Sequence, residues 1–167
     1  MTGWFERAGG ILLHPTSLPG PHGIGDLGGA AHRFVDFLAD AGLRLWQVLP
    51  VGPTGYGDSP YASFSTFAGN PLLVSLERLV EDGDLRAAEI EPPGFPADRV
   101  DFGRLIPWKL GLLDRAARRF LATATGGRRA AFERFSAAEK TWLDDYALFT
   151  AVKARHDERA RAKGHPG

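Results

Sequence analysis

Residues 30–51, AAHRFVDFLADAGLRLWQVLPV, contain the pattern that decides the fold. Four apolar side chains recur with the spacing of one face of an amphipathic helix: Phe34, Phe37, Leu38 and Ala41. Gly42 follows at the position where helices commonly end in a left-handed residue. Residues 43–51 are mainly apolar and are limited by Pro50, which is typical of a short buried strand. The stretch therefore predicts a helix over 30–41 followed directly by a strand.

A second apolar run lies on the N-terminal side of this helix. Residues 10–14, GILLH, are bounded by Gly and Pro, and a Gly- and Pro-rich loop joins them to the helix. The order strand, loop, helix, strand is that of a βαβ unit, which requires two parallel strands. The first half of the chain is therefore expected to be α/β.

The connecting loop contains HGIGDLGGAAH at residues 22–32, a G-x-G-x-x-G pattern. In a dinucleotide-binding unit the strand runs directly into the first glycine, and an acidic residue ends the next strand. Here eight residues separate His14 from Gly23, and the second strand ends in Pro50 and Val51. The glycines are therefore expected to provide tight turns and close backbone approach, and no cofactor is expected.

Charge and composition exclude several functional classes. The chain has 167 residues, of which 20 are basic and 20 acidic, so it lacks the positive footprint of a nucleic-acid-binding protein. It has no cysteine, which excludes disulfides, thiol catalysis and Cys-ligated zinc. No apolar run reaches the roughly 18 residues of a membrane span, and no signal peptide is evident. We expect a cytoplasmic protein that binds neither nucleic acid nor membranes.

The second half of the sequence has a different pattern. Residues 89–103 form a Pro-rich connector, and a helical pattern begins at Trp108. One face of this helix is apolar: Leu113, Ala116, Ala117, Phe120 and Leu121. Residues 128–134 favour another short helix, and Ser136–Glu139 resembles a capping box before a last helix. Residues 72–80 also favour a short helix, which would complete a second βα unit after the second strand. The chain is therefore divided into 1–88, the two βα units with their long loops, and 89–167, an α-helical module.

Residues 52–71, GPTGYGDSPYASFSTFAGNP, are termed here the aromatic loop. They follow the second predicted strand, show no helical period and bring four sugar-binding side-chain types together: Tyr56, Asp58, Ser59 and Tyr61. Loops of this length are usually functional or disordered, and the aromatic content argues against disorder. The alternative is that Tyr61 packs the loop onto the protein, and for Phe64 and Phe67 we favour such a core role.

Other titratable residues are weaker candidates. His14 ends the first strand, where either a site residue or a structural histidine would fit. Asp144 and Asp145 are adjacent on a predicted helix, so their side chains diverge by about 100° and do not form a converging acid–base pair. His22, His32 and His156 are isolated from other ligand-type residues at metal-binding spacing, so no metal site is expected.

Three blocks of the sequence resemble one known family. GGILLHPTSLPGPHGIGDLG, WQVLPVGPTGYGDSPYASFSTFAGNP and TWLDDYALFTAVKARH are similar to segments of the 4-α-glucanotransferases, also called amylomaltases or disproportionating enzymes. The resemblance implies the N-terminal part of a (β/α)8 barrel with an inserted α-helical subdomain, the barrel being incomplete in this chain. It also implies transfer of α-1,4-glucan segments to the 4-hydroxyl of an acceptor, with retention and without a cofactor. Its partners would be α-1,4-glucans and malto-oligosaccharides.

The resemblance assigns sugar-binding residues and no catalytic ones. Family members carry three catalytic carboxylates further downstream, so the remainder of the barrel is expected C-terminal to Gly167, and this chain alone is expected to be inactive. Ser59 and Tyr61 match positions that line the donor-sugar site, and Asp58 belongs to the same motif. Tyr56 matches a tyrosine of a secondary glucan-contact surface in some members.

Two other functions stay open at this point. The aromatic loop could belong to a stand-alone, non-catalytic glucan-binding module. The chain could also belong to a hydrolytic barrel α-glucosidase, because the residues that would choose between water and sugar as acceptor are not in this sequence.

Overall fold

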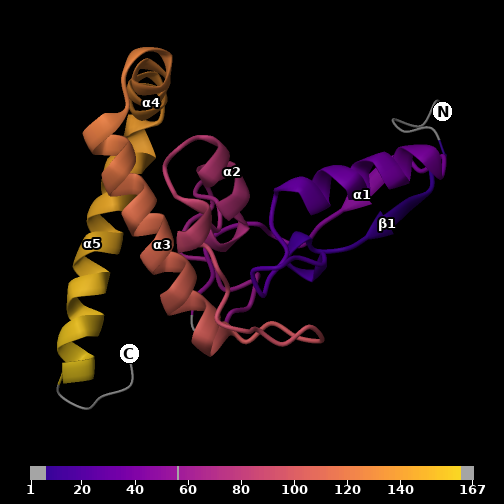
Figure 1. Cartoon of the computed structure of the whole chain (residues 1–167), viewed down its shortest axis with the longest axis horizontal. Coiled ribbons are helices and arrows are strands. Elements are labelled where there is room, and N and C mark those ends of the chain that lie inside the picture. Colours follow the sequence, from indigo (N-terminus) through magenta and orange to yellow (C-terminus); the bar gives the residue numbers. More distant parts are fainter. Residues whose placement is uncertain (1–6, 56, 163–167) are drawn as a thin grey trace. The chain divides into compact units, whose positions relative to one another are not determined.

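The computed structural model describes residues 7–55 and 57–162, in two compact units, Met1–Thr123 and Ala124–Gly167 (Figure 1). In chain order the elements are β1 (Gly10–Leu12), η1 (Pro15–Ser17), α1 (Gly29–Asp40), β2 (Leu45–Gln47), η2 (Pro71–Leu73), α2 (Leu76–Glu81), η3 (Ala87–Glu89), α3 (Phe102–Thr123), α4 (Gly126–Ala138) and α5 (Lys140–Ala162). The boundary between these units differs from the boundary at 88/89 expected from the sequence. The expected boundary separates a barrel from its inserted subdomain, and it stays a prediction.

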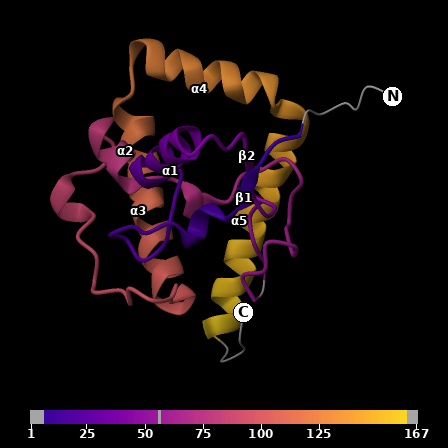
Figure 2. The same cartoon turned by 90° about the vertical axis from the view of Figure 1, so that its right-hand side faces the viewer.

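The predicted βαβ unit is confirmed. Strands β1 and β2 are parallel, with Ile11 opposite Trp46, and α1 connects them (Figure 2). The strands are shorter than the apolar runs at 10–14 and 43–51. Three residue pairs form the ladder, from Gly10–Leu45 to Leu12–Gln47. A side chain at Gly10 would lie 2.6 Å from the carbonyl oxygen of Leu45, so the first pair of the ladder requires glycine.

Helix α1 packs against the sheet through part of the expected face. Leu38 is buried, and the ring of Phe34 meets that of Trp46 edge-on at 5.0 Å. Gly42 has a φ of +68°, and the amide of Leu43 donates to the carbonyl of Leu38. This left-handed residue ends the helix and turns the chain into β2, as the sequence predicts.

The glycines of residues 23–28 lie where the backbone passes close to other segments. A side chain at Gly25 would collide with the carbonyl oxygen of Pro15. A side chain at Gly28 would lie 2.5 Å from the hydroxyl of Ser75, and Gly23 has a φ of +75° beside the ring of Phe95. The predicted close approach therefore applies to Gly25, which meets main-chain atoms, and to Gly28, which meets side chains, while Gly23 provides a left-handed turn.

Helix α3 forms the core of the first unit. Its buried face consists of Leu105, Lys109, Leu112 and Ala116, so of the predicted apolar face Ala116 is buried, and Leu113 packs against the core while partly buried. Leu121 is half exposed. Two apolar clusters lie along the buried face, one with Leu76 and one with Ile24, and Trp108 packs against both.

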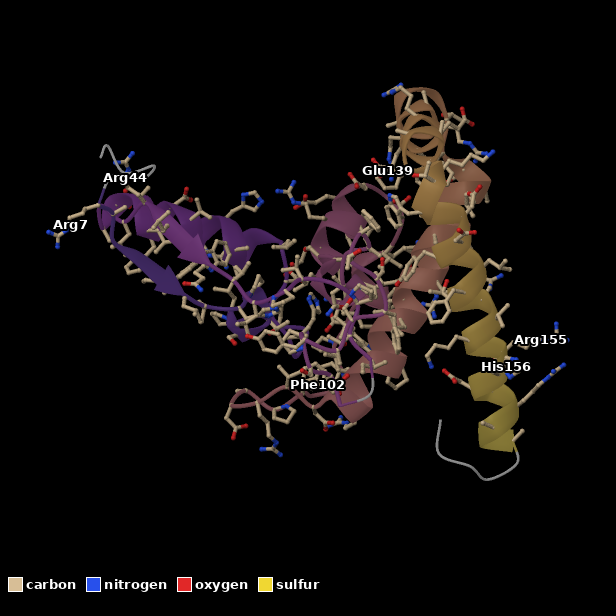
Figure 3. All side chains as sticks on the ribbon, turned by 180° about the vertical axis from the view of Figure 1, so that it is seen from behind. Arg7, Arg44, Phe102, Glu139, Arg155 and His156 are labelled. Atoms are coloured by element: carbon tan, nitrogen blue, oxygen red, sulfur yellow. The ribbon has the colours of Figure 1, made fainter. Side chains whose placement is uncertain are left out.

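Two helix boundaries differ from the sequence prediction. Helix α3 begins at Phe102, before Trp108 (Figure 3). The carboxylate of Asp101 accepts a hydrogen bond from the amide of Arg104 and so caps the first turn. Pro107 lies inside the helix. The capping box at Ser136 is wrong. Ser136 lies within α4, and Glu139 alone separates α4 from α5.

A carboxylate links the connector to α3. Glu89 accepts hydrogen bonds from Arg119 at 2.9 Å and from Arg115 at 3.2 Å, and these lower its pKa from 4.5 to about 2. A lowered folded-state pKa means that the stabilisation is present above pH 4.5 and is lost as the pH falls toward 2.

The pH dependence of this stabilisation can be measured by urea denaturation. The wild type should be more stable than Glu89→Gln at about pH 6, and this difference in the free energy of unfolding should shrink between about pH 4.5 and 2.5. A constant difference across this window would contradict the assignment.

Within the described part of the chain, no helix is both long and apolar enough to cross a membrane.

Candidate functional site

The carboxyl ends of the two strands lie next to each other. His14 follows β1, and its Nδ1 accepts from the amide of Thr16 at 3.3 Å, which leaves Nε2 to donate to the carbonyl of Pro50 at 3.4 Å. Pro50 follows β2, so the histidine joins the exits of both strands. These contacts favour the structural role of His14 over a chemical one.

The aromatic loop is a small hairpin fixed by its own main chain. The amide of Gly55 donates to the carbonyl of Ala62 at 2.7 Å, and the amide of Phe64 donates to the carbonyl of Pro53 at 3.3 Å. The amide of Asn70 donates to the carbonyl of Val51 at 2.7 Å and closes the base of the loop. The loop is therefore ordered by hydrogen bonds at the carboxyl end of β2.

The structure brings three of the four predicted sugar-binding residues to the tip of this hairpin. The side chain of Tyr61 is 74% exposed, and its amide donates to the hydroxyl of Ser59 at 3.3 Å. Asp58 has a φ of +54°, a conformation that Asn and Asp tolerate better than most residues. Tyr56 lies outside the described residues. The exposure of Tyr61 argues against the alternative that its ring packs the loop onto the protein.

Among the described residues, Phe64 and Phe67 do not take the core role favoured for them. Phe67 is 70% exposed and Phe64 is about half exposed, with its ring lying over Gly55. Hydrogen bonds from the amides of Phe67 and Ala68 to the hydroxyl of Ser65 hold this side of the loop. Hydrogen bonds to the hydroxyl of Ser65 therefore help to fix the loop.

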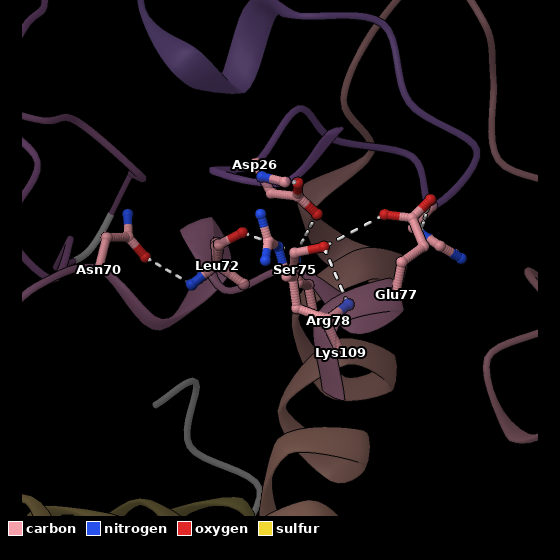
Figure 4. Close-up of polar contacts among 9 residues, drawn as sticks. Asp26, Asn70, Leu72, Ser75, Glu77, Arg78 and Lys109 are labelled. Carbon is pink, nitrogen blue, oxygen red and sulfur yellow. Dashed lines mark hydrogen bonds and ion pairs between the residues drawn. The ribbon is translucent and has the colours of Figure 1, made fainter. Parts of the chain in front are cut away.

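A buried polar cluster adjoins the base of the loop, and the sequence interpretation missed it. The ammonium of Lys109 is fully buried, donates to the carbonyl of Leu72 at 2.7 Å and lies 3.7 Å from the carboxylate of Asp26 (Figure 4). Asp26 also accepts from the amide of Gly28 at 2.8 Å. A charged residue on the apolar face of a helix is the signal that could have revealed this cluster.

The electrostatics of the cluster follow from burial. Burial lowers the pKa of Lys109 and raises the pKa of Asp26, and in each case the charge of the partner opposes the shift. Burial also lowers the pKa of His22, whose ring stacks on Trp108 at 6.1 Å and lies 4.0 Å from Glu77. Among the described residues, no three His, Asp or Glu side chains gather closely enough to hold a metal ion.

The comparison with protein families identifies the family of this chain. The family model described as 4-alpha-glucanotransferase matches residues 13–164. The chain belongs to this family. The resemblance in the three sequence blocks is thereby confirmed, and the third block lies in α5.

Individual 4-alpha-glucanotransferases match the chain closely. The enzyme of Thermus thermophilus is 57% identical over 150 residues, which are 90% of this chain and 29% of that protein. That of a Synechocystis strain is 47% identical over 153 residues, 91% of this chain and 30% of that protein. The amylomaltase from Streptococcus agalactiae, solved in complex with acarbose, superposes with a TM-score of 0.83 at 37% identity over 90% of this chain and 30% of that one. The chain therefore spans about 30% of the length of these relatives.

Proposed function

We propose that this chain supplies the first glucan-binding loop of a 4-alpha-glucanotransferase, which transfers a segment of an α-1,4-glucan to the 4-hydroxyl of an acceptor glucan or glucose. Family membership over residues 13–164 is the observation that carries the proposal. The acarbose bound to the amylomaltase neighbour supports malto-oligosaccharides as the ligand class. The cytoplasmic location stays an expectation from the sequence.

The sheet fits the opening of a (β/α)8 barrel, with the helices from α3 onward belonging to an inserted subdomain. Parallel pairing of β1 and β2 through α1 is the unit from which such barrels are built. Leu12 and Leu45 on these strands are more than half exposed, as expected of strands that further barrel elements would cover. In this architecture the loops that follow the carboxyl ends of the strands form the active site.

The aromatic loop follows one of these carboxyl ends and carries suitable chemistry. The exposed ring of Tyr61 offers an apolar face for the C–H surface of a glucose unit. Its phenol, the hydroxyl of Ser59 and the carboxylate of Asp58 offer hydrogen-bond partners for sugar hydroxyls. Their part in the reaction is to hold the donor sugar in place.

Bond cleavage requires groups that this chain does not supply. Retaining transfer needs one carboxylate that attacks the anomeric carbon and one acid that protonates the departing oxygen and then deprotonates the acceptor. We assign no residue of this chain to either role, so the chain alone is expected to be inactive. Positioning of the donor lowers the entropic cost of reaching the reactive geometry.

The test uses a hybrid enzyme in which this chain replaces the matching segment of the Thermus thermophilus enzyme. In the hybrid, Tyr61→Ala should lower kcat/KM for maltotriose disproportionation by roughly 30-fold, because truncation of an aromatic anchor costs about 2 kcal/mol. Phe67→Ala, which removes a similarly exposed ring from the same loop, should change kcat/KM by less than about threefold. Equal effects of the two substitutions would remove the assignment of Tyr61.

The products of the hybrid distinguish the remaining alternatives. Longer malto-oligosaccharides formed from maltotriose indicate transfer, whereas only glucose and shorter chains indicate a hydrolytic α-glucosidase. Calorimetric titration of the chain alone with maltoheptaose tests the stand-alone binding module, which requires stoichiometric binding without the rest of a barrel.

A further inference from the structure

The lysine buried in the apolar face of α3 has no role in the proposed sugar contacts. Lys109 lies between Leu105 and Leu112 on that face, and the three side chains are buried together. Burying an ammonium group is costly unless it is paired and hydrogen-bonded. Its place in the core therefore calls for a specific partner.

That partner is the segment directly after the aromatic loop. The ammonium of Lys109 donates to the carbonyl of Leu72, whose own amide donates to the side-chain oxygen of Asn70 at 2.9 Å. The main-chain amide of Asn70 in turn donates to the carbonyl of Val51 at the other end of the loop. A chain of three hydrogen bonds thus connects α3 to both ends of the aromatic loop.

The same ammonium group faces the loop that follows β1. It lies 3.7 Å from Asp26, and the amide of Leu27 donates to the carbonyl of Leu73 at 3.0 Å. In Figure 4, Asp26 and Leu72 lie on different segments of the chain and both adjoin Lys109. The contacts of Lys109 therefore join the loops that follow β1 and β2 to a single point on α3.

A buried ion pair of this kind adds little stability, because desolvation offsets the attraction between the charges. It does fix geometry, since an ammonium hydrogen bond to a carbonyl has a defined length and direction. An apolar side chain of similar length would fill the space without fixing the position of Leu72.

We propose that Lys109 is a positioning residue for glucan binding: it holds the base of the aromatic loop at a fixed place relative to the loop of Asp26. The proposal rests on the proposed function, because the loop matters only if it contacts the donor. It deepens that function because it makes α3 the element that orients the aromatic loop, while the tip of the loop with Tyr61 stays exposed.

The first test measures hydrogen exchange in the full chain. The variant combines Asp26→Asn with Lys109→Met, so that no unpaired charge remains in the core, and the introduced side-chain amide can still accept a hydrogen bond from Gly28. We expect exchange at the amides of Asn70, Leu72 and Leu27 to become at least about tenfold faster, with other core amides unchanged.

Arg119→Met is the matched control on α3. This substitution releases Glu89 and the carbonyl of Asp84, which Arg119 contacts at 2.9 Å each. It should therefore speed exchange around residues 84–90 only, and leave the amides of Asn70 and Leu72 as they are in the wild type.

The second test measures kinetics in the hybrid enzyme. A loosened loop base should raise KM for maltoheptaose about tenfold while kcat changes less than about threefold, because ground-state binding is weakened. The control Arg119→Met should leave both parameters unchanged. Asp26→Asn with Lys109→Leu, which likewise leaves no unpaired charge in the core, provides a second variant if the first double substitution does not fold.

Three results would overturn the proposal: unchanged exchange at residues 70–72, uniformly faster exchange throughout the core, or faster exchange with an unchanged KM. The first shows that Lys109 does not hold the loop, the second that its role is only structural, and the third that the loop position does not affect binding. If Tyr61→Ala also leaves the kinetics unchanged, the proposed function fails as well, whereas an effect of Tyr61→Ala alone confines the failure to Lys109.

Discussion

Replacement of Gly25 by alanine is expected to lower the free energy of unfolding of this chain by about 3 kcal/mol, at the upper end for overpacking substitutions. The added Cβ would collide with the carbonyl oxygen of Pro15 and would lie 2.6 Å from that of Leu18. Both are main-chain atoms, so no side-chain rotation relieves the contact. The amide of Gly25 also donates to the carbonyl of Thr16 at 3.0 Å, which holds the two segments together.

The control is the same substitution at an open glycine. Gly111 lies within α3, and beyond the adjoining helix backbone nothing lies within 4 Å of the added Cβ, so Gly111→Ala should stabilise the chain by about 0.5–1 kcal/mol through helix propensity. Urea denaturation measures both values. A loss below about 1 kcal/mol for Gly25→Ala would show that the loop yields to the side chain and that the close approach is not required.

Replacement of Leu105 by alanine is expected to cost about 2–5 kcal/mol, because it removes a fully buried side chain and leaves a cavity. Leu105 packs in a cluster with Ile24 and Leu72. These two residues belong to the two loop segments that also meet at Lys109. Leu110→Ala on the same helix is the control, because Leu110 is 41% exposed, and it should cost less than about 1 kcal/mol. Urea denaturation of the two variants gives both losses, and equal losses would contradict the placement of Leu105 in the core.

The comparison of Leu105 with Lys109 separates the contribution of apolar burial to stability from that of the buried charged pair. If the proposal for Lys109 is correct, the double substitution at Asp26 and Lys109 changes the urea midpoint much less than Leu105→Ala does. Equal losses would mean that the charged pair is part of the stabilising core, contrary to the expectation that burial offsets its attraction.

The sequence predicted the elements that are stabilised by interactions between residues close together in the chain. The apolar spacing of residues 30–41 and the left-handed Gly42 specify α1 and its end, because both depend on side chains within a few turns. The glycines of residues 23–28 were interpreted correctly as points of close approach, since the context of a dinucleotide site was absent. The aromatic loop was also recognised, because its residue types occur within one short stretch.

The sequence did not predict features that depend on distant partners. Phe64 and Phe67 are exposed in this chain, whereas composition alone favours burial for aromatic side chains. The early start of α3 depends on a single capping carboxylate at Asp101. The continuation of α4 through Ser136 shows that a capping sequence does not begin a helix when the preceding helix runs through it.

By itself, then, the sequence determined the βαβ order, the parallel strands and the resemblance to the 4-alpha-glucanotransferases, and it singled out the aromatic loop as the candidate sugar-binding segment. These follow from periodicity, turn residues and motif blocks, all of which are contiguous in the chain. Only the tertiary structure decided that Lys109 is buried and that it meets Asp26 and the carbonyl of Leu72. The physical reason is that a charged side chain can be buried only where it is paired and hydrogen-bonded. The partners of Lys109 come from two loops that are distant from it in sequence.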